Sequence, residues 1–339
     1  MLTDKRVVVT GGTGSLGQAL VRRLLEGDAG LPAEVVVFSR SEALQHEMRL
    51  GFLHRRVATD EIVYDEERHS RLRFRIGDVR DYDAVAAVLE GADVVLHAAA
   101  MKQVPTCEYH PAEAVNTNVG GARNIVRAIA DRRLEVEAVV GVSTDKACKP
   151  VNVMGMTKAL QERILLEAGL RSPGTRFVVA RYGNVVASRG SVVPLFEEQI
   201  ASGGPVTVTT PEMTRFLLSL DQAVDTVFEA HRTGRQGETY IPLLPAVRIE
   251  ELARAMIGDR DIEVSFVGIR PGEKVHEVLV SEEEAPRTHA RGSHLAISPL
   301  LPELRADPEP GAEPYAGREY SSADEVVAAE RSLELLRSR

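Results

Sequence analysis

The first half of the chain alternates short apolar runs with longer segments that have the periodicity of a helix. The runs, rich in valine, cover residues 6–10, 34–39, 71–79, 92–99, 137–144 and 176–185. Between them, residues 15–27, 41–56 and 84–92 place apolar side chains on one face of a helix. Strands that are apolar at nearly every position are typical of a parallel sheet covered by helices on both faces. The pattern therefore predicts a doubly wound α/β fold.

Beyond residue 183 the pattern becomes irregular, and short strands mix with helices. We therefore predict three parts. A nucleotide-binding domain covers residues 1–183, and a smaller α/β substrate lobe covers 184–300. Within the second range, the chain returns to the first domain from about 217–245 and adds elements to its sheet. Residues 301–339 form a C-terminal arm with a Pro- and Gly-rich acidic stretch and a final helix, for which Ser322 and a Glu three residues later have the spacing of a capping box.

Composition narrows the classes of partner. The chain has 339 residues and a net charge of -9, with 44% apolar and 27% charged residues. An acidic chain has no general electrostatic attraction to nucleic acid, so an anionic ligand needs a local basic site. No apolar run is long enough to span a membrane and no signal peptide precedes the first strand, so we expect a cytoplasmic protein without a membrane partner. Two cysteines, Cys107 and Cys148, argue against disulfides and against a metal site.

A glycine-rich loop joins the first strand to the first helix. Its sequence, TGGTGSLG, covers residues 10–17. Glycines at the end of a strand let the chain turn tightly, so that backbone N–H groups at the helix N-terminus approach a pyrophosphate. The loop predicts a nicotinamide dinucleotide bound to a Rossmann-type domain, and a purely structural turn is the alternative. The contacts are assigned to Gly11, Thr13, Gly14, Ser15, Leu16 and Gly17.

The end of the second strand predicts which dinucleotide binds. An Asp or Glu at this place binds the 2′-hydroxyl of NAD, whereas an Arg accommodates the 2′-phosphate of NADP. This chain has Ser39 and Arg40 here and no acid. We therefore predict NADP rather than NAD, with both side chains on the phosphate. The alternative is that Arg40 is a surface residue and that the ribose is bound elsewhere. Asp78, after the third strand, is expected near the adenine.

Two strand ends carry the candidate chemistry. The fourth strand ends in His97 and three alanines, whose small side chains let a cofactor lie close to the backbone. The fifth ends in the string STDK at 143–146, so a hydroxyl, a carboxyl and an amine meet at the edge where ligands bind in this architecture. Met154 and Lys158 follow four residues apart, on one face of a helix. These groups predict an enzyme that moves protons beside a dinucleotide.

Through the glycine loop, the string HAAA at 97–100 and the helix that contains Lys158, the chain resembles the extended short-chain dehydrogenase/reductase superfamily. The strings STDKACKPVNVMGMTK, RYGNVVASRGSVVPLF, MTRF and RPGEKVHE are similar to those of bacterial UDP-N-acetylglucosamine 4,6-dehydratases of polysaccharide biosynthesis. The resemblance runs from about residue 3 to 280 and, more loosely, over 319–325. It implies an NADP-dependent lyase that removes water from a UDP-sugar and leaves a 4-keto-6-deoxy sugar, with or without inversion at C5.

The chain departs from the superfamily at Met154. The usual pattern there is Tyr-x-x-x-Lys, and a thioether cannot act as a base. An inactive dinucleotide-binding regulator is therefore one alternative. Against it, one branch of these dehydratases resembles this chain in carrying Met, and the Asp145–Lys146 pair is intact. A further alternative is a UDP-hexose 4-epimerase, which has no use for an acid/base pair that serves C5 and C6.

The resemblance assigns a role to each catalytic residue. The C4 hydroxyl is oxidised by hydride transfer to the nicotinamide, Lys146 removes the C5 proton, Asp145 protonates the departing C6 hydroxyl, and the hydride returns to C6. Thr144 hydrogen-bonds the C4 oxygen and Lys158 holds the nicotinamide ribose. We expect burial and nearby cations to lower the pKa of Lys146 so that it is a neutral base. For the C4 hydroxyl the base is Lys146 or a water molecule, and we hypothesise the water.

The resemblance also implies the rest of both binding sites. On the cofactor side it adds Val79, Ala98, Ala99, Ala100, Lys102, Asn118 and Tyr182. On the substrate side it assigns Lys102, Asn184, Arg189, Ser191, Val192, Arg215, Arg270 and Glu273. Arg270 takes the diphosphate, since arginine binds phosphates bidentately, and Glu273 takes the uridine ribose. A homo-oligomer, either a dimer or a hexamer, is expected.

Overall fold

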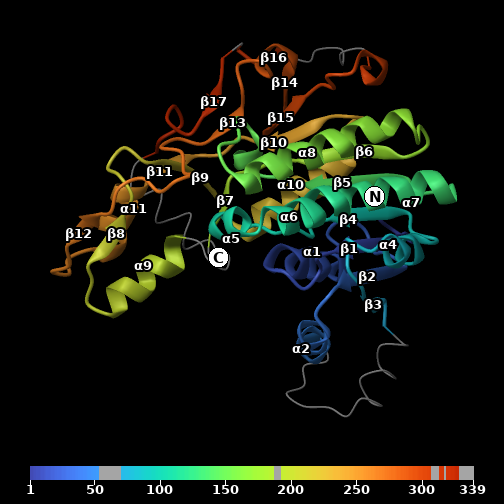
Figure 1. Cartoon of the computed structure of the whole chain (residues 1–339), viewed down its shortest axis with the longest axis horizontal. Coiled ribbons are helices and arrows are strands. Elements are labelled where there is room, and N and C mark those ends of the chain that lie inside the picture. The colour runs from blue at the N-terminus through green and yellow to red at the C-terminus, as the bar shows by residue number, and fades with distance from the viewer. Residues whose placement is uncertain (53–69, 187–191, 307–312, 317, 328–339) are drawn as a thin grey trace.

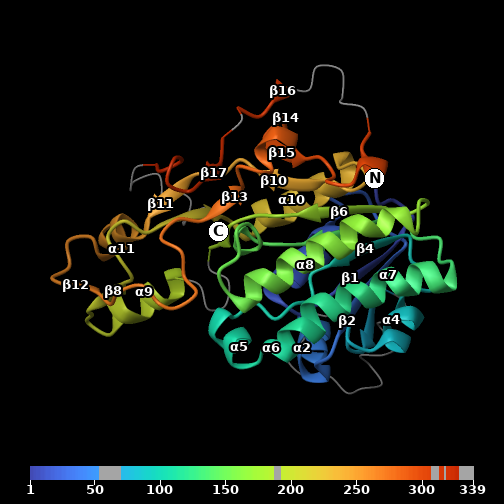
Figure 2. The same cartoon turned by 45° about the horizontal axis from the view of Figure 1, so that its top comes forward.

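The computed structural model describes residues 1–52, 70–186, 192–306, 313–316 and 318–327 of the chain. One large sheet runs through them (Figures 1 and 2). Its main part consists of the parallel strands β1 (Arg6–Thr10), β2 (Glu34–Ser39), β3 (Leu72–Ile76), β4 (Val94–His97), β5 (Ala138–Val142) and β6 (Arg176–Ala180). Their order is β3-β2-β1-β4-β5-β6, so the direction of winding reverses between β1 and β4 and leaves a crevice at their carboxyl ends. The predicted doubly wound α/β fold is confirmed.

Strands from the second half of the chain extend the sheet beyond β6. The strand β10 (Thr239–Pro242) runs parallel to β6. Antiparallel strands follow in the order β15 (His294–Ile297), β14 (Thr288–Arg291) and β16 (Glu313–Pro314). The domain boundaries at residues 183 and 300 stay a prediction.

Helices cover both faces of the sheet, which explains why its strands are apolar at nearly every position. They are α1 (Ser15–Glu26), α2 (Glu42–Phe52), α4 (Tyr82–Leu89), α7 (Gly120–Arg132), α8 (Val153–Glu167) and α10 (Leu220–Thr233). The short helices α5 (Val104–Tyr109) and α6 (Pro111–Ala114) pack against α8. Leu24 of α1 shares one apolar core with Val7, and Ile125 of α7 shares the other with Val8. Successive strand side chains point to opposite faces, so both valines need an apolar partner. None of the described helices is long and apolar enough to cross a membrane.

A smaller group of elements lies to one side of the sheet and has a core of its own (Figure 1). It contains α9 (Val192–Ala201), α11 (Ile249–Ile257) and the strands β7 (Asn184–Val185), β8 (Val206–Val208), β9 (Thr214–Leu218), β11 (Ala246–Arg248) and β12 (Val264–Phe266). Phe196, Leu217 and Leu252 are buried there.

The predicted strand at 176–185 is split in two. The first half is β6, and the second, β7, pairs with β9 in a different sheet. The chain crosses between the sheets at Gly183, where a Cβ atom would lie 2.5 Å from Cβ of Phe216 in β9. The glycine therefore permits a close approach that an unbroken strand would not need.

The C-terminal arm differs from its prediction. Tyr320–Ser321 form a strand, β17, that pairs with β13 (Val278–Val280). The hydroxyl of Ser322 is fully buried and accepts a hydrogen bond from the Glu277 N–H at 2.9 Å, so it does not cap a helix and that prediction is wrong. Residues 324–327 are not helical. The rest of the predicted final helix lies outside the described residues.

Candidate functional site

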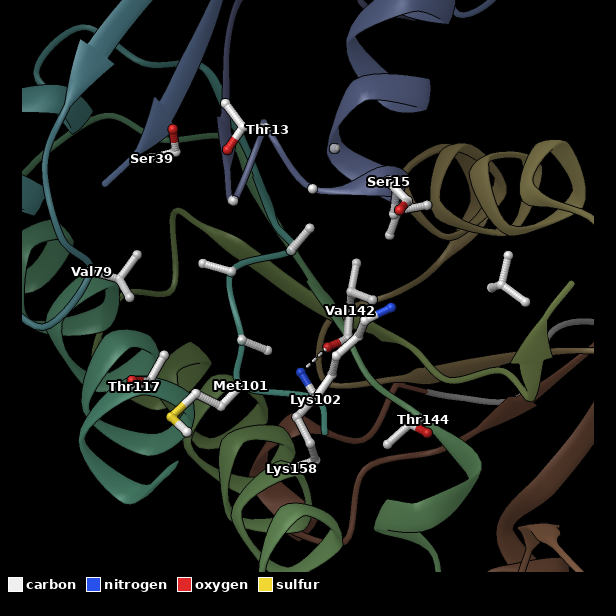
Figure 3. Close-up of a pocket in the computed structure, with 18 of the residues that line it drawn as sticks. Thr13, Ser15, Ser39, Val79, Met101, Lys102, Thr117, Val142, Thr144 and Lys158 are labelled. Carbon is white, nitrogen blue, oxygen red and sulfur yellow. Dashed lines mark hydrogen bonds between the residues drawn. The ribbon is translucent and has the colours of Figure 1, made fainter. Parts of the chain in front are cut away.

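A cavity of about 550 Å³ opens at the carboxyl ends of the parallel strands (Figure 3). The predicted residues that line it are Gly11, Thr13, Gly14, Ser15, Leu16, Gly17, Ser39, Arg40, Val79, Ala98, Ala99, Ala100, Lys102, Thr144, Lys146, Met154, Lys158, Tyr182 and Asn184. We call the part with the glycine loop, Ser39 and Arg40 the dinucleotide end. The part with Thr144, Lys146 and Asn184 is the reaction end. Figure 3 shows Thr13, Ser15 and Ser39 on one side of the cavity and Thr144 and Lys158 on the other.

The glycine loop is shaped by contacts that leave no room for side chains. Gly11 has a φ of 66°, and a Cβ atom on it would lie 2.7 Å from the backbone of Ala99. A Cβ atom on Gly17 would lie 2.4 Å from the carbonyl oxygen of Gly11. Gly14, the N-cap of α1, has no side chain with which to cap the helix. The first N–H groups of α1 are thus left for an anion at the positive end of the helix dipole, a geometry that fits a pyrophosphate.

At the dinucleotide end, Ser39 and Arg40 both line the cavity. The Gln45 amide donates to the Ser39 carbonyl oxygen at 3.1 Å and to its hydroxyl oxygen at 3.0 Å, which fixes that side chain. The Arg40 side chain is 61% exposed, and Nη1 lies 3.9 Å from Oδ2 of Asp78. An exposed guanidinium with so long an ion pair remains able to contact an anionic ligand.

Asp78 itself is not among the lining residues. The Arg80 side chain donates to its Oδ2 at 2.8 Å, and the Arg80 backbone N–H donates to its Oδ1 at 2.9 Å. Burial by itself would raise the pKa of Asp78, but the hydrogen bonds from Arg80 outweigh it and lower the pKa. The carboxylate expected near the adenine is therefore engaged by Arg80.

Lys146 lies at the centre of the reaction end. Its Nζ is 3.0 Å from Oδ1 of Asp145, 3.2 Å from Oδ1 of Asn184 and 3.3 Å from Oε1 of Glu277. The Thr144 hydroxyl donates to the same Oδ1 of Asp145 at 2.8 Å. Asp145 is fully buried, and its Oδ2 has no hydrogen-bond partner among the described residues. The hydroxyl, carboxyl and amine of the string TDK are thus brought together.

The expected low pKa of Lys146 is wrong for this structure. Burial alone would lower the pKa, and Arg215 acts in the same direction. The carboxylates of Asp145 and Glu277 more than offset both and raise the pKa. Lys146 is therefore an ammonium in the ligand-free protein. The expectation failed because Glu277, from a distant part of the chain, adds a second carboxylate.

Lys158 lies on the cavity wall and is almost fully buried. Its Nζ donates to the Val142 carbonyl oxygen at 2.6 Å (Figure 3) and to Oε1 of Gln161 at 2.8 Å. Burial lowers the pKa of Lys158 to about 8, although the carboxylate of Glu162 opposes this. An amine with this pKa can serve as a hydrogen-bond donor to a ligand hydroxyl in either protonation state.

Met154 and Asn118 both have structural roles, but only Met154 lines the cavity. Met154 lines the cavity, is 4% exposed and packs with Cys107 and Ala114, so no acid or base stands at this position. Asn118 is fully buried and not among the lining residues. Its amide donates to the Met101 carbonyl oxygen at 3.0 Å and its Oδ1 accepts from the Met101 N–H at 2.8 Å. Asn118 therefore shapes the backbone beside the cavity.

The predicted substrate residues are only partly brought together. Lys102 and Asn184 line the cavity, whereas Val192, Arg215, Arg270 and Glu273 do not. Arg215 is buried, and its guanidinium donates to the carbonyl oxygens of residues 214, 274 and 275, so it holds backbone. Arg189 and Ser191 lie outside the described residues. The diphosphate and uridine contacts stay predictions.

Several lining residues were missed by sequence reasoning. They are Phe38, Ser41, Leu44, Gly77, Met101, Gln103, Thr117, Val142, Ser143, Gly183, Val185 and Leu220. Most contribute apolar surface or backbone. Ser143, Gly183 and Val185 lie within the quoted strings but carry no group that pointed to a ligand. The more consequential omission is Glu277, which contacts Lys146 from outside the cavity. Glu277 is the last residue of the string RPGEKVHE, so the sequence contained the residue in a quoted motif but gave no sign of its contact with Lys146.

Comparison with known proteins places this site in a family. The profile of the polysaccharide biosynthesis protein family matches residues 7–299. The UDP-glucose 4-epimerases of Rickettsia typhi and Rickettsia massiliae are 41% and 42% identical to the chain, over 99% of its length and over 91% and 90% of theirs.

Solved structures show the same fold. Pen from Bacillus thuringiensis has a TM-score of 0.86 and 34% identity, over 100% of this chain and 98% of that chain. The dTDP-glucose 4,6-dehydratase DesIV from Streptomyces venezuelae has a TM-score of 0.65 and 24% identity, over 80% and 86% of the two chains, which is a likeness of fold alone. The extended short-chain dehydrogenase/reductase fold is thereby confirmed. The dehydratase branch within it stays a prediction.

Proposed function

The chain belongs to the polysaccharide biosynthesis protein family, and from this premise we propose that it is an NADP-dependent UDP-sugar 4,6-dehydratase. The proposed substrate is UDP-N-acetylglucosamine, and the product is a 4-keto-6-deoxy sugar nucleotide, with or without inversion at C5. Two comparisons support an enzyme that modifies a sugar nucleotide. Relatives of the chain are named as UDP-glucose 4-epimerases, and a structure with the same fold is named as a dTDP-glucose 4,6-dehydratase.

The observation that carries the proposal is the Asp145–Lys146 pair. A buried carboxyl group and an amine lie 3.0 Å apart beside Thr144. Thr144 and Lys146 line the cavity, whereas Asp145 is fully buried and is not among the lining residues. Removing water across C5 and C6 needs a base for the C5 proton and an acid for the C6 hydroxyl, in reach of one another. Epimerisation at C4 needs neither group. A buried charged pair is costly to keep unless it has a function or full pairing, and Oδ2 of Asp145 has no partner among the described residues.

The residues of the reaction end divide the proton transfers among them. A bound nicotinamide supplies hydride transfer from C4 and back to C6. Thr144 turns its hydroxyl from Asp145 to the C4 oxygen and polarises the ketone, which acidifies the C5 proton. Lys146, as the free amine, then takes that proton at Nζ, and Asp145, as the carboxylic acid 3.0 Å away, gives its proton to the C6 hydroxyl, which leaves as water. Once the hydride has returned to C6, Lys146 gives a proton that has exchanged with solvent to C5. The proton that the C4 hydroxyl released to water returns to Asp145, so the protein regains its starting charges.

NADP is proposed over NAD on the chemistry of the dinucleotide end. Ser39 offers a hydroxyl and Arg40 an exposed guanidinium at the end of β2, where NAD would be met by a carboxylate. Lys158 is proposed to hold the nicotinamide ribose, because its donors lie on the wall between the two ends. For the C4 hydroxyl, water remains the proposed proton acceptor, since Met154 offers no base.

A UDP-glucose 4-epimerase is the second candidate, because relatives at 41% and 42% identity bear that name. It would use the same dinucleotide and the same ketone. On that account, however, Asp145 and Lys146 have no chemistry to perform at C5 and C6, and the C4 hydroxyl must be deprotonated without a tyrosine. We therefore rank it second.

Incubation with UDP-N-acetylglucosamine and NADP, followed by proton NMR, separates the candidates. Dehydration predicts a new C6 methyl doublet and loss of the C6 methylene signals. A galacto-configured product without a methyl signal would support the epimerase and overturn the dehydratase. If neither UDP-N-acetylglucosamine nor any other UDP-hexose is converted, both enzymatic proposals fail.

A further inference from the structure

A buried carboxylate behind the reaction end has no assigned role. Glu277 lies next to the start of β13, is 2% exposed and does not line the cavity. Its Oε1 is 3.3 Å from Nζ of Lys146, and its Oε2 is 3.5 Å from Nζ of Lys274. A carboxylate is rarely so deeply buried without a partner that needs it. Glu277 therefore links the proposed base to a second lysine that lies outside the cavity.

The surroundings of Lys146 show what Glu277 contributes. An ammonium has three N–H donors, and three acceptors surround this one: Asp145, Asn184 and Glu277. Of these three, only Asn184 lines the cavity, whereas Asp145 and Glu277 are buried outside it. Without Glu277, Asp145 would be the one carboxylate in contact with the amine among the described residues, and Asn184 the one neutral acceptor. Glu277 thus completes a three-point support that fixes the direction of the amine.

Glu277 is itself held by distant parts of the chain. Its N–H donates to the Ser322 hydroxyl at 2.9 Å, and that hydroxyl lies 2.7 Å from Oγ1 of Thr214. The Ser322 N–H in turn donates to the Glu277 carbonyl oxygen at 2.9 Å. Lys274 is anchored by a hydrogen bond to the Cys148 carbonyl oxygen at 2.7 Å. The C-terminal arm and the segment after η2 (Asp145–Ala147) therefore set where the carboxylate stands.

We propose that Glu277 is a positioning residue for the proposed dehydration, holding the Lys146 amine between Asp145 and Asn184 and governing its charge from behind the cavity. The inference rests on the proposed function, because it assumes that Lys146 reacts as a free amine. Glu277 does not touch the substrate. It acts through Lys146 alone.

The charges that face Lys146 give the sign of the effect. Asp145 and Glu277 favour the ammonium, whereas Arg215 disfavours it, and Lys274 weakens Glu277 by pairing with its second oxygen. Neutralising Glu277 therefore lowers the pKa of Lys146, and neutralising Lys274 raises it. A base works only when deprotonated, so a lower pKa moves the rising limb of the pH–rate profile to lower pH. The two substitutions must shift the profile in opposite directions.

The test compares pH profiles of dehydration for three variants and the wild type. Glu277→Gln keeps the size of the side chain and one acceptor oxygen but removes the charge, and it is expected to move the rising limb of kcat/KM down by about one pH unit. Lys274→Gln is expected to move it up by a smaller amount. Glu282→Gln makes the same chemical change on a carboxylate that is 73% exposed, and should leave the profile in place. KM should change less than kcat in the Glu277 variant, because Glu277 does not touch the substrate.

Each outcome decides one claim. Opposite shifts for Glu277→Gln and Lys274→Gln support the inference, since damage to the fold would lower rates without moving the limb in two directions. If the rising limb of the pH profile shifts in neither variant, the inference is overturned. If Glu277→Gln fails to fold, as judged by its thermal transition, the upward shift of Lys274→Gln decides alone. Failure of the proposed function would instead appear in the wild type, as absence of the methyl signal.

Discussion

The two ends of the cavity hold their ligands with different parts of the chain. At the dinucleotide end the pyrophosphate would meet mainly backbone, because glycines and alanines line the part of the cavity next to the loop. At the reaction end the ligand would meet polar and charged side chains, since Oδ1 of Asp145 and Oδ1 of Asn184 both lie within 3.2 Å of Nζ of Lys146. The first end depends on shape and the second on charge.

This difference indicates which kind of substitution would impair each end. A single methyl group can block the dinucleotide end, because the neighbouring atoms are backbone and cannot move aside. At the reaction end the loss of one charge alters the protonation of the others. The predictions below set steric changes against electrostatic ones, from the largest expected effect to the smallest.

Removing the amine at the reaction end should have the largest effect. Lys146→Met is expected to lower the rate of dehydration by about 100- to 10,000-fold, because the base at C5 is lost. NADP binding, measured by fluorescence titration, should change little, since that end is built from backbone. Lys149→Met is the matched control, three residues away and 40% exposed, and should keep its activity. Equal loss of NADP binding and activity in the Lys146 variant would contradict the separation of the two ends.

Adding one methyl group at the dinucleotide end should act in the opposite way. In Gly17→Ala the new Cβ would lie 2.4 Å from a backbone oxygen, so the loop must shift away from the geometry that would bind the pyrophosphate. Restoring that geometry on binding is expected to cost about 2 kcal/mol, or roughly 30-fold in NADP affinity. Gly51→Ala adds the same methyl group where no atom lies within 4 Å, and should bind NADP normally. Titration of NADP into both variants measures the difference. Wild-type affinity in Gly17→Ala would show that the loop does not enclose the cofactor.

Lys158, between the two ends, makes stability depend on pH. Its folded pKa of about 8 lies below its unfolded value of 10.5, so burial of its charge costs stability below pH 8 and the cost disappears as pH rises toward 10.5. The free energy of unfolding of the wild type should therefore gain about 2 kcal/mol between pH 7.5 and 9.5 relative to Lys158→Met. Urea unfolding of both proteins at the two pH values measures this. If the free energy of unfolding changes equally with pH in the wild type and in Lys158→Met, Lys158 is not buried as an ammonium.

The choice of dinucleotide should show the smallest effect. Arg40→Ala is expected to weaken NADP binding by about tenfold, as one charge-assisted contact is lost at an exposed site. NAD affinity is the internal control and should stay within about twofold, because NAD has no 2′-phosphate for the arginine to contact. An equal loss for both dinucleotides would mean that Arg40 supports the loop and does not read the phosphate.

The dinucleotide end could be predicted from the sequence because its signals are local. The turn glycines, the strand before them and the helix after them are neighbours in the chain, so Gly11, Gly14 and Gly17 could be assigned directly. The same holds for the strands and helices of the sheet, whose apolar pattern follows from burial on two faces. The split of residues 176–185 at Gly183 was missed because it depends on β9, which approaches from elsewhere.

The reaction end could be predicted only in part because its charges come from distant segments. The string TDK showed that Asp145 and Lys146 are adjacent, but the expected low pKa of Lys146 ignored Glu277. Ser322 has the spacing of a helix cap, yet its hydroxyl is bound to the Glu277 backbone. Tertiary contacts overrode a local signal in both cases.

The central claim is that the Asp145–Lys146 pair performs chemistry at C5 and C6, and deuterium at C5 tests it most directly. The protein is incubated with UDP-N-acetylglucosamine in D₂O, and the product is examined by proton NMR and mass spectrometry. The account predicts a 4-keto-6-deoxy product with solvent deuterium at C5, and no such product from Lys146→Met. A product with a changed C4 configuration and no deuterium at C5 would contradict it.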